Sequence, residues 1–324
     1  MILEHGTRLL ASFAVLTVGG GPALVALAFL VSKWLGTALL FQPLRHLTGT
    51  AARLSLGFVV RQALPFALFF AASAFLNRMD SLVLAFFLPL ADVGFYGAAT
   101  RLVFFGTIAS QAFGLALHPY LLASRSRPER YHHLASTSLA KVAAVSFVPA
   151  GFLHAFPSST LRLLHIDPYL PAASLIAILS LALPALFSSE VFFRCLLAED
   201  RVRGAVRVAV LQIAIGLPSL VVAAFLYGAQ GVAMASLLVA WLGALGYLFA
   251  CQKTGLVLWS RWTMALAFGG TVTAGVKALA PSHSNLALVL LAAYALAAIG
   301  HGISRWRDVS NADELPRKMG DNPE

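Results

Sequence analysis

Apolar residues fill long stretches of this chain, and charged residues fall in the short segments between them. Asp, Glu, Lys and Arg are absent from the blocks 9–32, 102–124, 142–161, 168–189, 208–252 and 278–304. A helix that crosses a bilayer needs roughly 20 consecutive apolar residues. Because backbone groups in lipid must be hydrogen-bonded within their own segment, such stretches predict helices. The pattern therefore predicts an all-α, polytopic membrane protein with about nine spans. The predicted spans are 9–32, 62–88, 92–122, 138–157, 170–198, 205–227, 230–251, 262–280 and 286–304.

Turn-forming residues separate these spans. Pro89 lies between the second and third spans, and Asp167-Pro168 precedes the fifth. Tyr227-Gly228-Ala229-Gln230-Gly231 divides the uncharged block 208–252 into two stretches of membrane length. Between the first two spans, the segment 33–61 interleaves basic residues with leucines. This pattern favours an amphipathic connector lying on the membrane surface over an irregular linker.

Composition and charge agree with this interpretation. Hydrophobic residues make up 59% of the 324 residues and charged residues 11%, whereas soluble domains carry roughly 25% charged residues. Most of the basic residues fall in the connector 33–61, in the loops after the third, fifth and seventh spans, and in the tail 305–324. The positive-inside rule then places the N-terminus outside and the C-terminal tail in the cytoplasm. The net charge of +10 indicates contact with anionic membrane lipid and not with nucleic acid, because no soluble basic face exists.

Aromatic residues and cysteines add two smaller expectations. Trp34, Trp259, Trp262 and Trp306 fall at predicted inner-surface helix ends, where an aromatic belt is expected. Cys195 and Cys251 lie in apolar spans and are interpreted as packing residues, since two cysteines form no disulfide framework.

The motifs of common enzymes and metal sites are absent from the sequence. It contains no G-x-x-x-x-G-K-[ST] phosphate loop, no H-E-x-x-H and no Cys/His cluster, so it predicts no cofactor and no metal site. The predicted outer loops are also too short to hold a soluble substrate. We therefore expect that the chain is not an enzyme. A membrane-embedded glycan polymerase or acyltransferase stays an alternative from a different class.

Charged residues inside predicted spans are the candidate functional residues, because a charge at membrane depth is costly unless it faces a cavity or a partner. Asn77, Arg78 and Asp80 lie on the second span and Arg101 on the third. In an antiparallel hairpin the two arginines come to a similar depth, and Asp80 can pair with either one. Two arginines that share one carboxylate leave a positive site, which suits a phosphate or another anion. A helix-packing pair is the alternative.

A second group of charges lies on the fifth span. Glu190 and Arg194 are spaced i,i+4 in the favourable order. Here a structural ion pair is at least as strong a hypothesis as a second substrate site.

The segment 76–122 resembles polysaccharide flippases of the multidrug/oligosaccharidyl-lipid/polysaccharide exporter superfamily. The matching residues are Asp80, Leu82, Leu84, Val93-Gly94, Tyr96, Ala99, Arg101-Leu102 and Pro119. The stretch from Tyr169 to Leu197, the basic loop 200–207 and the Tyr227–Ala233 turn resemble the later helices of the same family.

This resemblance implies a transporter of two six-helix lobes around a central cavity, in a bacterial inner membrane. It implies a polyprenyl-diphosphate-linked oligosaccharide as cargo, for cell-surface polysaccharide or lipopolysaccharide synthesis. In that frame 1–32 is the last helix of an N-terminal lobe, 33–61 the cytoplasmic connector and 62–251 the C-terminal lobe. The segment 262–304 is then an extra helix pair. Arg78 and Arg101 would meet the diphosphate, with Asn77 beside them and Asp80 holding them.

The chain also departs from the family pattern, because the first five helices of the family have no counterpart in it. We therefore expect a truncated chain, or a half that assembles with a second lobe or with glycan-assembly proteins. A drug/cation antiporter of the same fold and a non-transporting membrane scaffold are the alternative functions.

Overall fold

The computed structural model describes residues 10–15, 17, 19, 21–44, 56–252, 259–281 and 283–298, and this part of the chain contains helices and no strands. The chain divides into two compact units, Met1–Ala63 and Leu64–Glu324. Helices α2 to α5 are Pro22–Leu44, Leu56–Phe87, Leu90–Ser124 and Pro128–Ala155. Helices α6 to α8 are Pro157–Leu163, Ala173–Ser180 and Leu183–Ala198, with the 3-10 helix η2 at Asp167–Ala172. Helices α9 and α10 are Val202–Gln252 and Trp259–Leu279, and a last helix is Ser284–Ala298.

The first unit corrects the prediction of one helix over 9–32. Residues 10–15 are helical, Gly19 then adopts a positive φ of 76°, and α2 begins at Pro22. A glycine takes this backbone conformation at little cost, and a proline suits the first turn of a helix, so the chain breaks here. Residues 33–44 continue α2, and residues 56–61 begin α3. The predicted amphipathic connector is therefore not a separate helix in the described residues, and its segment 45–55 lies outside them.

In the second unit, α9 is a helical hairpin folded at Gly228. A straight helix of its 51 residues would be about 76 Å long, far more than the roughly 30 Å of a bilayer core. Gly228 has φ 59° and ψ −144°, which is not helical. The two halves then run back along each other, since the Gln212 amide donates to the Val239 carbonyl at 3.1 Å. This confirms the turn predicted at Tyr227–Gly231, which folds the uncharged block into two helical segments.

The predicted fifth span, 170–198, is broken in two. Helices α7 and α8 meet at an angle of 46° across Leu181 and Ala182. Pro184, in the first turn of α8, has no backbone N–H, so it cannot continue the series of backbone hydrogen bonds that begins in α7. Two carbonyls near this break accept hydrogen bonds from side chains of other helices, and the Ser180 hydroxyl also donates to the first of them, Ala177, at 2.9 Å. His154 Nδ1 lies 2.8 Å from the Ala177 oxygen, and the Trp241 indole donates to the Leu181 oxygen at 3.3 Å.

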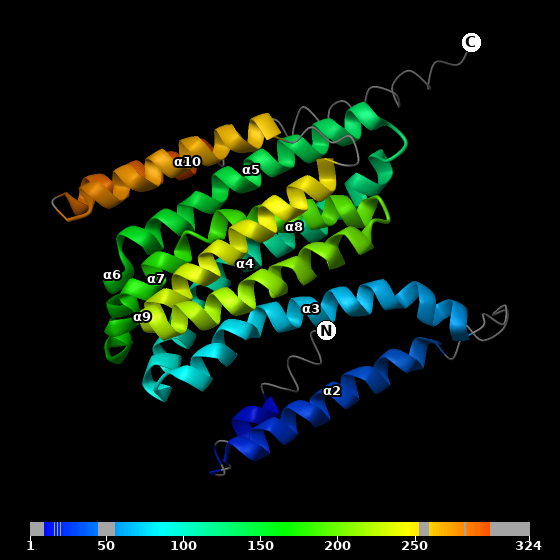
Figure 1. Cartoon of the computed structure of the whole chain (residues 1–324), viewed down its shortest axis with the longest axis horizontal. Coiled ribbons are helices and arrows are strands. Elements are labelled where there is room, and N and C mark those ends of the chain that lie inside the picture. The colour runs from blue at the N-terminus through cyan, green and yellow to red at the C-terminus, as the bar shows by residue number, and fades with distance from the viewer. Residues whose placement is uncertain are drawn as a thin grey trace. The chain divides into compact units, whose positions relative to one another are not determined.

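Helix α8 lies at the centre of this unit and packs against α4, α5 and α9, while α10 lies along α5 (Figure 1). Its buried residues include Phe192, Cys195 and Leu196, and Cys251 of α9 is buried as well. Both cysteines are free thiols, as expected for packing residues. Trp262 of α10 is only 2% exposed and its indole donates to the Ser188 hydroxyl at 2.9 Å. The prediction that Trp262 belongs to an interfacial aromatic belt is therefore wrong.

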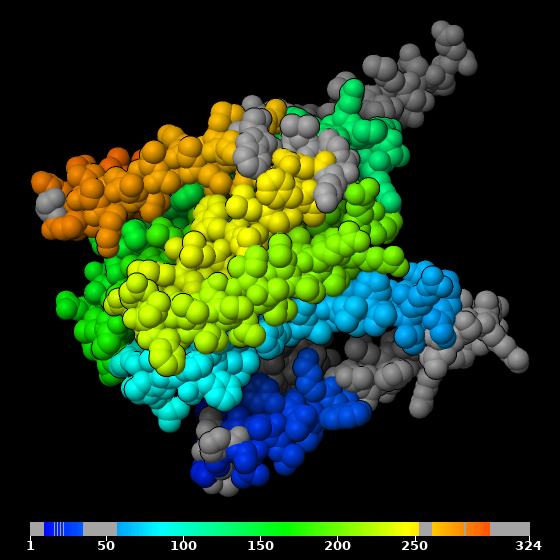
Figure 2. Space-filling model, in the orientation of Figure 1, coloured from blue at the N-terminus to red at the C-terminus, as the bar shows by residue number. Residues whose placement is uncertain are grey.

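The outer surface of the unit is apolar, as a membrane requires. Large hydrophobic side chains such as Val222, Phe225 and Leu238 are exposed along α9, which forms much of the face in Figure 2. Four helices of the described chain are long and apolar enough to cross a membrane, or five with the bent α7–α8 pair. The molecule is thus a multi-pass helical membrane protein, and the predicted number of nine spans is not confirmed.

Helix α5 begins at Pro128, ten residues before the start at 138 that the sequence predicts.

Candidate functional site

Asp80 lies at a point where three helices meet. Its carboxylate accepts a hydrogen bond from the Ser81 backbone N–H at 2.6 Å and another from the Tyr96 hydroxyl of α4 at 2.7 Å. The Tyr96 oxygen is also 2.9 Å from the Ser236 hydroxyl in the second half of α9. Since the single phenolic hydrogen goes to Asp80, Ser236 donates to Tyr96. Tyr96 is fully buried, so this chain of hydrogen bonds joins α3, α4 and α9 inside the protein.

A small cavity lies beside this network. Its polar lining comes from Asn77, Asp80, Thr100, Gln212 and Ser236, and the remaining lining residues are apolar. The cavity has a volume of about 120 Å³, whereas pockets for small-molecule ligands are typically about 300–1,000 Å³. At roughly 30 Å³ per water molecule, the space suits a few waters or a small ion. It is too small for the sugars and diphosphate of a glycan carrier.

Asp80 does not hold the two arginines, contrary to the prediction. Among the described residues, its carboxylate bonds to Tyr96 and Ser81 and forms no ion pair with Arg78 or Arg101. Residues two apart on a helix point to nearly opposite sides, so Arg78 cannot share the cavity face with Asp80. Both arginines are exposed on the surface of the unit, whereas Asn77 lines the cavity.

The similar depth expected for the two arginines stays a prediction. Arg78 lies on α3 and Arg101 on α4, the two helices that the Leu88-Pro89 turn connects.

Glu190 and Arg194 form the predicted i,i+4 ion pair. Arg194 donates through Nε at 2.7 Å and through Nη2 at 2.5 Å to the same Glu190 oxygen, and the two side chains are 18% (Glu190) and 15% (Arg194) exposed. Gly114 of α4 makes room for the carboxylate, because a Cβ at that position would lie 2.6 Å from the Glu190 oxygen. The Arg194 guanidinium also lies 5.6 Å from the centre of the Phe193 ring. Neither charged residue lines the Asp80 cavity.

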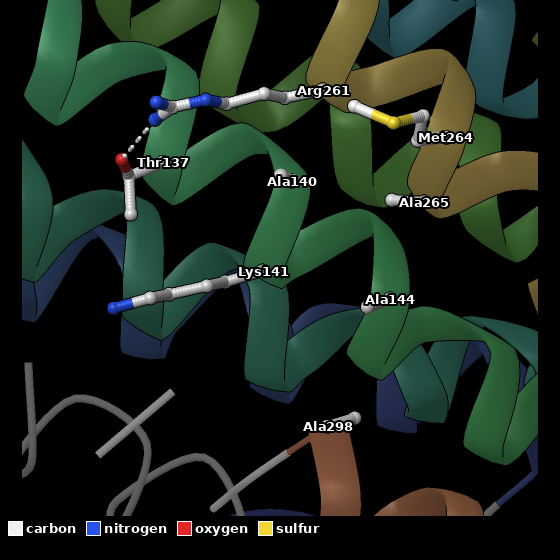
Figure 3. A pocket seen from close by; sticks show the side chains of 8 residues that line it. All are labelled: Thr137, Ala140, Lys141, Ala144, Arg261, Met264, Ala265 and Ala298. Atoms are coloured by element: carbon white, nitrogen blue, oxygen red, sulfur yellow. Dashed lines mark hydrogen bonds between the residues drawn. The ribbon is translucent and has the colours of Figure 1, made fainter. Parts of the chain in front are cut away.

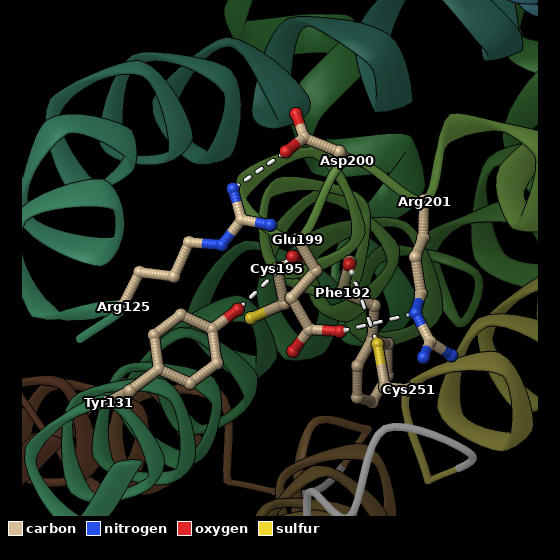
Figure 4. A network of polar contacts seen from close by, with 8 residues as sticks. All are labelled: Arg125, Tyr131, Phe192, Cys195, Glu199, Asp200, Arg201 and Cys251. Atoms are coloured by element: carbon tan, nitrogen blue, oxygen red, sulfur yellow. Dashed lines mark hydrogen bonds and ion pairs between the residues drawn. The ribbon is translucent and has the colours of Figure 1, made fainter. Parts of the chain in front are cut away.

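A further polar cluster joins two loops at one end of the unit (Figure 4). Arg125, after α4, pairs with Asp200, after α8, at 2.6 Å. The Tyr131 hydroxyl donates to the Cys195 carbonyl at 3.1 Å. The Arg125 and Asp200 side chains are 51% and 78% exposed, and such surface pairs contribute little to stability. The loop after α4 and the loop after α8 are both basic, and the sequence predicts them on the same side of the membrane. The Arg125–Asp200 ion pair shows that these two loops lie at the same end of the unit.

The described residues contain no cluster of His, Cys, Asp and Glu suited to a metal ion.

Four members of the site were missed by sequence reasoning. Tyr96 was identified only as part of a family motif, and Thr100, Gln212 and Ser236 were not predicted as site residues. Gln212 bridges the halves of α9, and its amide also lines the cavity. One sequence feature could have indicated the contact between Tyr96 and Asp80. The two residues lie on opposite sides of the turn at Pro89 and only sixteen positions apart, so the turn can bring them together.

Comparison with known proteins gives a fold and no close relative. No protein-family model matches the chain, and no curated protein sequence matches it. The structure is similar to a solved structure of the lipid II flippase MurJ in its inward closed conformation, with a TM-score of 0.62 and 13% sequence identity. The match covers 95% of this chain and 66% of that protein, so the chain spans just under two thirds of its length. The chain therefore has the helical fold of a flippase-type membrane transporter.

Proposed function

We propose that this chain is all or part of a transporter that moves a polyprenyl-diphosphate-linked oligosaccharide across a bacterial inner membrane. The cargo would serve cell-surface polysaccharide synthesis. The supporting observation is the fold, which is shared over 95% of the chain with a protein named as a lipid II flippase. The proposal is transport and not catalysis.

In this proposal Arg78 and Arg101 bind the anionic diphosphate. Both side chains are exposed on the unit, and neither has a carboxylate partner in the described chain. A guanidinium at membrane depth needs an anion, a water-filled cavity or another protein surface. Arginine also matches phosphate oxygens in a two-pronged geometry that lysine lacks. Since the Asp80 cavity is too small, the proposed cargo path runs outside it, along the surface that carries the arginines.

Asp80 has a different role from the predicted one. Its hydrogen bonds to Tyr96, and through it to Ser236, tie α3 to α4 and α9. In the proposed transporter this network fixes the helix that carries Arg78, while the carboxylate itself does not contact the cargo.

A gene deletion complemented with the 324-residue chain tests the proposal. The readouts are surface polysaccharide and lipid-linked oligosaccharide on the inner leaflet. We expect the wild-type chain to restore surface polysaccharide, and the double variant R78A/R101A to leave the lipid-linked precursor accumulated. The control R203A/R207A also removes two exposed arginines, from α9, and is expected to behave as wild type.

The outcomes separate the parts of the proposal. Full rescue by R78A/R101A would show that the two arginines do not bind cargo. Rescue only by a version extended upstream of Met1 would show that the activity needs a longer protein. Absence of any polysaccharide phenotype on deletion would refute the cargo assignment.

A drug/cation antiporter is the second candidate, favoured by the Asp80 cavity. One carboxylate with hydroxyl and amide groups in a space of about 120 Å³ is a chemistry and size that suit a small cation. The variant D80N in proteoliposomes tests this function. Loss of cation-driven substrate efflux in D80N, with lipid-linked oligosaccharide transport absent from the wild type, would favour the antiporter.

A further inference from the structure

A second and larger cavity lies between α5, α10 and the end of the last helix, away from the Asp80 site. Its volume is about 290 Å³. Thr137, Lys141 and Ala144 line it from one face of α5, because residues three and four apart share a helix face. Arg261 and Ala265 line it from α10 with the same spacing. Two helix faces therefore form the walls of one groove.

The polar groups of this groove gather at one end. Arg261 donates to the Thr137 hydroxyl at 3.1 Å, and the Lys141 side chain extends toward the same end (Figure 3). Among the described residues that line the cavity, none is an aspartate or a glutamate. This described lining carries two basic side chains and one hydroxyl group, which suit a phosphate group.

The rest of the groove is apolar. Its remaining lining consists of four alanines and Met264. From Thr137 to Ala144 the cavity wall follows α5 for roughly 10 Å, so the apolar part extends well beyond the cations. Small side chains leave open space along a helix, and an acyl chain can occupy such a space. Arg261 lies in the first turn of α10, the level at which lipid headgroups meet a membrane helix.

We propose that this groove binds an anionic phospholipid, with its phosphate between Lys141 and Arg261 and one acyl chain along the alanine wall. A free phosphate would satisfy the cations but leave the apolar length of the groove empty, which is why a lipid fits better. This site is separate from the proposed cargo site and does not depend on the proposed function.

Binding of phosphatidylglycerol to the purified, delipidated full chain in detergent tests the proposal, with native mass spectrometry as the readout. We expect the double variant K141A/R261A to bind phosphatidylglycerol about thirtyfold more weakly, since each basic residue near anionic lipid contributes about fivefold. The matched control R203A/R207A loses the same charge elsewhere and is expected to stay within about twofold of wild type.

A third variant separates the lipid from its headgroup. A144F fills the apolar wall without changing the charge, and we expect it to weaken phosphatidylglycerol binding while the thermal unfolding temperature stays near that of wild type. Equal binding by K141A/R261A and R203A/R207A would overturn the proposal. So would binding of zwitterionic phosphatidylcholine as tight as that of phosphatidylglycerol, or competition by inorganic phosphate at equal concentration.

Discussion

Replacing Tyr96 with phenylalanine removes one oxygen atom from the hydrogen-bond chain that joins α3, α4 and α9. The side chain is fully buried, so the phenyl ring keeps its packing and only the polar contacts are lost. Asp80 loses a 2.7 Å donor, and the Ser236 hydroxyl loses an acceptor at 2.9 Å. We expect the variant to fold and to be measurably less stable.

The size of the effect depends on the setting of the bond. A hydrogen bond to a charged group contributes about 1.5–3 kcal/mol in water-soluble proteins. Hydrogen bonds between membrane helices average about 0.6 kcal/mol, with a maximum of about 1.7. Because Y96F affects two bonds at once and one of them involves a carboxylate, we expect a loss of about 2 kcal/mol. That corresponds to a fall of roughly 4–8 °C in Tm.

The cysteines of the chain provide the assay. Cys195 and Cys251 are its two cysteines, and both are buried in the second unit. A thiol-reactive fluorophore therefore reports unfolding of this unit during heating in detergent. Y227F is the matched control, because Tyr227 is 71% exposed and loses the same hydroxyl group. If the Tm values of Y96F and Y227F agree within about 1 °C, the hydrogen bonds of Tyr96 do not hold the three helices together.

Three further changes test other contacts by the same assay. G114A places a Cβ against the Glu190 carboxylate and is expected to cost about 1–3 kcal/mol, whereas G97A, where a Cβ meets open space, should leave Tm unchanged or raise it slightly. E190Q removes the charge opposite a mostly buried guanidinium and should lower Tm more than Y96F does, and an unchanged Tm would show that the pair is not stabilising. G228A forces a side chain into the turn of α9 at φ 59° and should cost about 1–2 kcal/mol, with G270A, at an open helical position, as control. Equal Tm values for those two glycine variants would contradict the role of the turn.

The helical class and the turn in α9 follow from the sequence because each depends on one local property. An uncharged run of 45 residues is too long for one membrane crossing, and the glycines at 228 and 231 mark where it folds. The Glu190–Arg194 pair follows in the same way, because residues four apart on one helix are neighbours whatever surrounds them.

The partners of Asp80 depend on packing between helices, and periodicity within one helix does not determine them. Charge alone favoured the two arginines, but the carboxylate faces α4 and α9, where a tyrosine and a serine supply the donors. The sequence also leaves open, for a related reason, whether the span that contains Pro184 bends or breaks. A proline within an apolar span is compatible with a kink or with a full break, and contacts with other helices decide between them.

The break has a consequence for which substitutions the chain tolerates. Positions that face lipid accept most apolar residues, but the Trp241 indole donates to the Leu181 carbonyl at the point where the backbone hydrogen bonds of helices α7 and α8 are interrupted. An apolar residue of similar size at position 241 would leave that oxygen without this donor. The Ala177 carbonyl depends less on His154, because the Ser180 hydroxyl also donates to it at 2.9 Å. In a saturation-mutagenesis map, position 241 should therefore stand out as a polar requirement amid stretches where leucine, valine and phenylalanine are interchangeable.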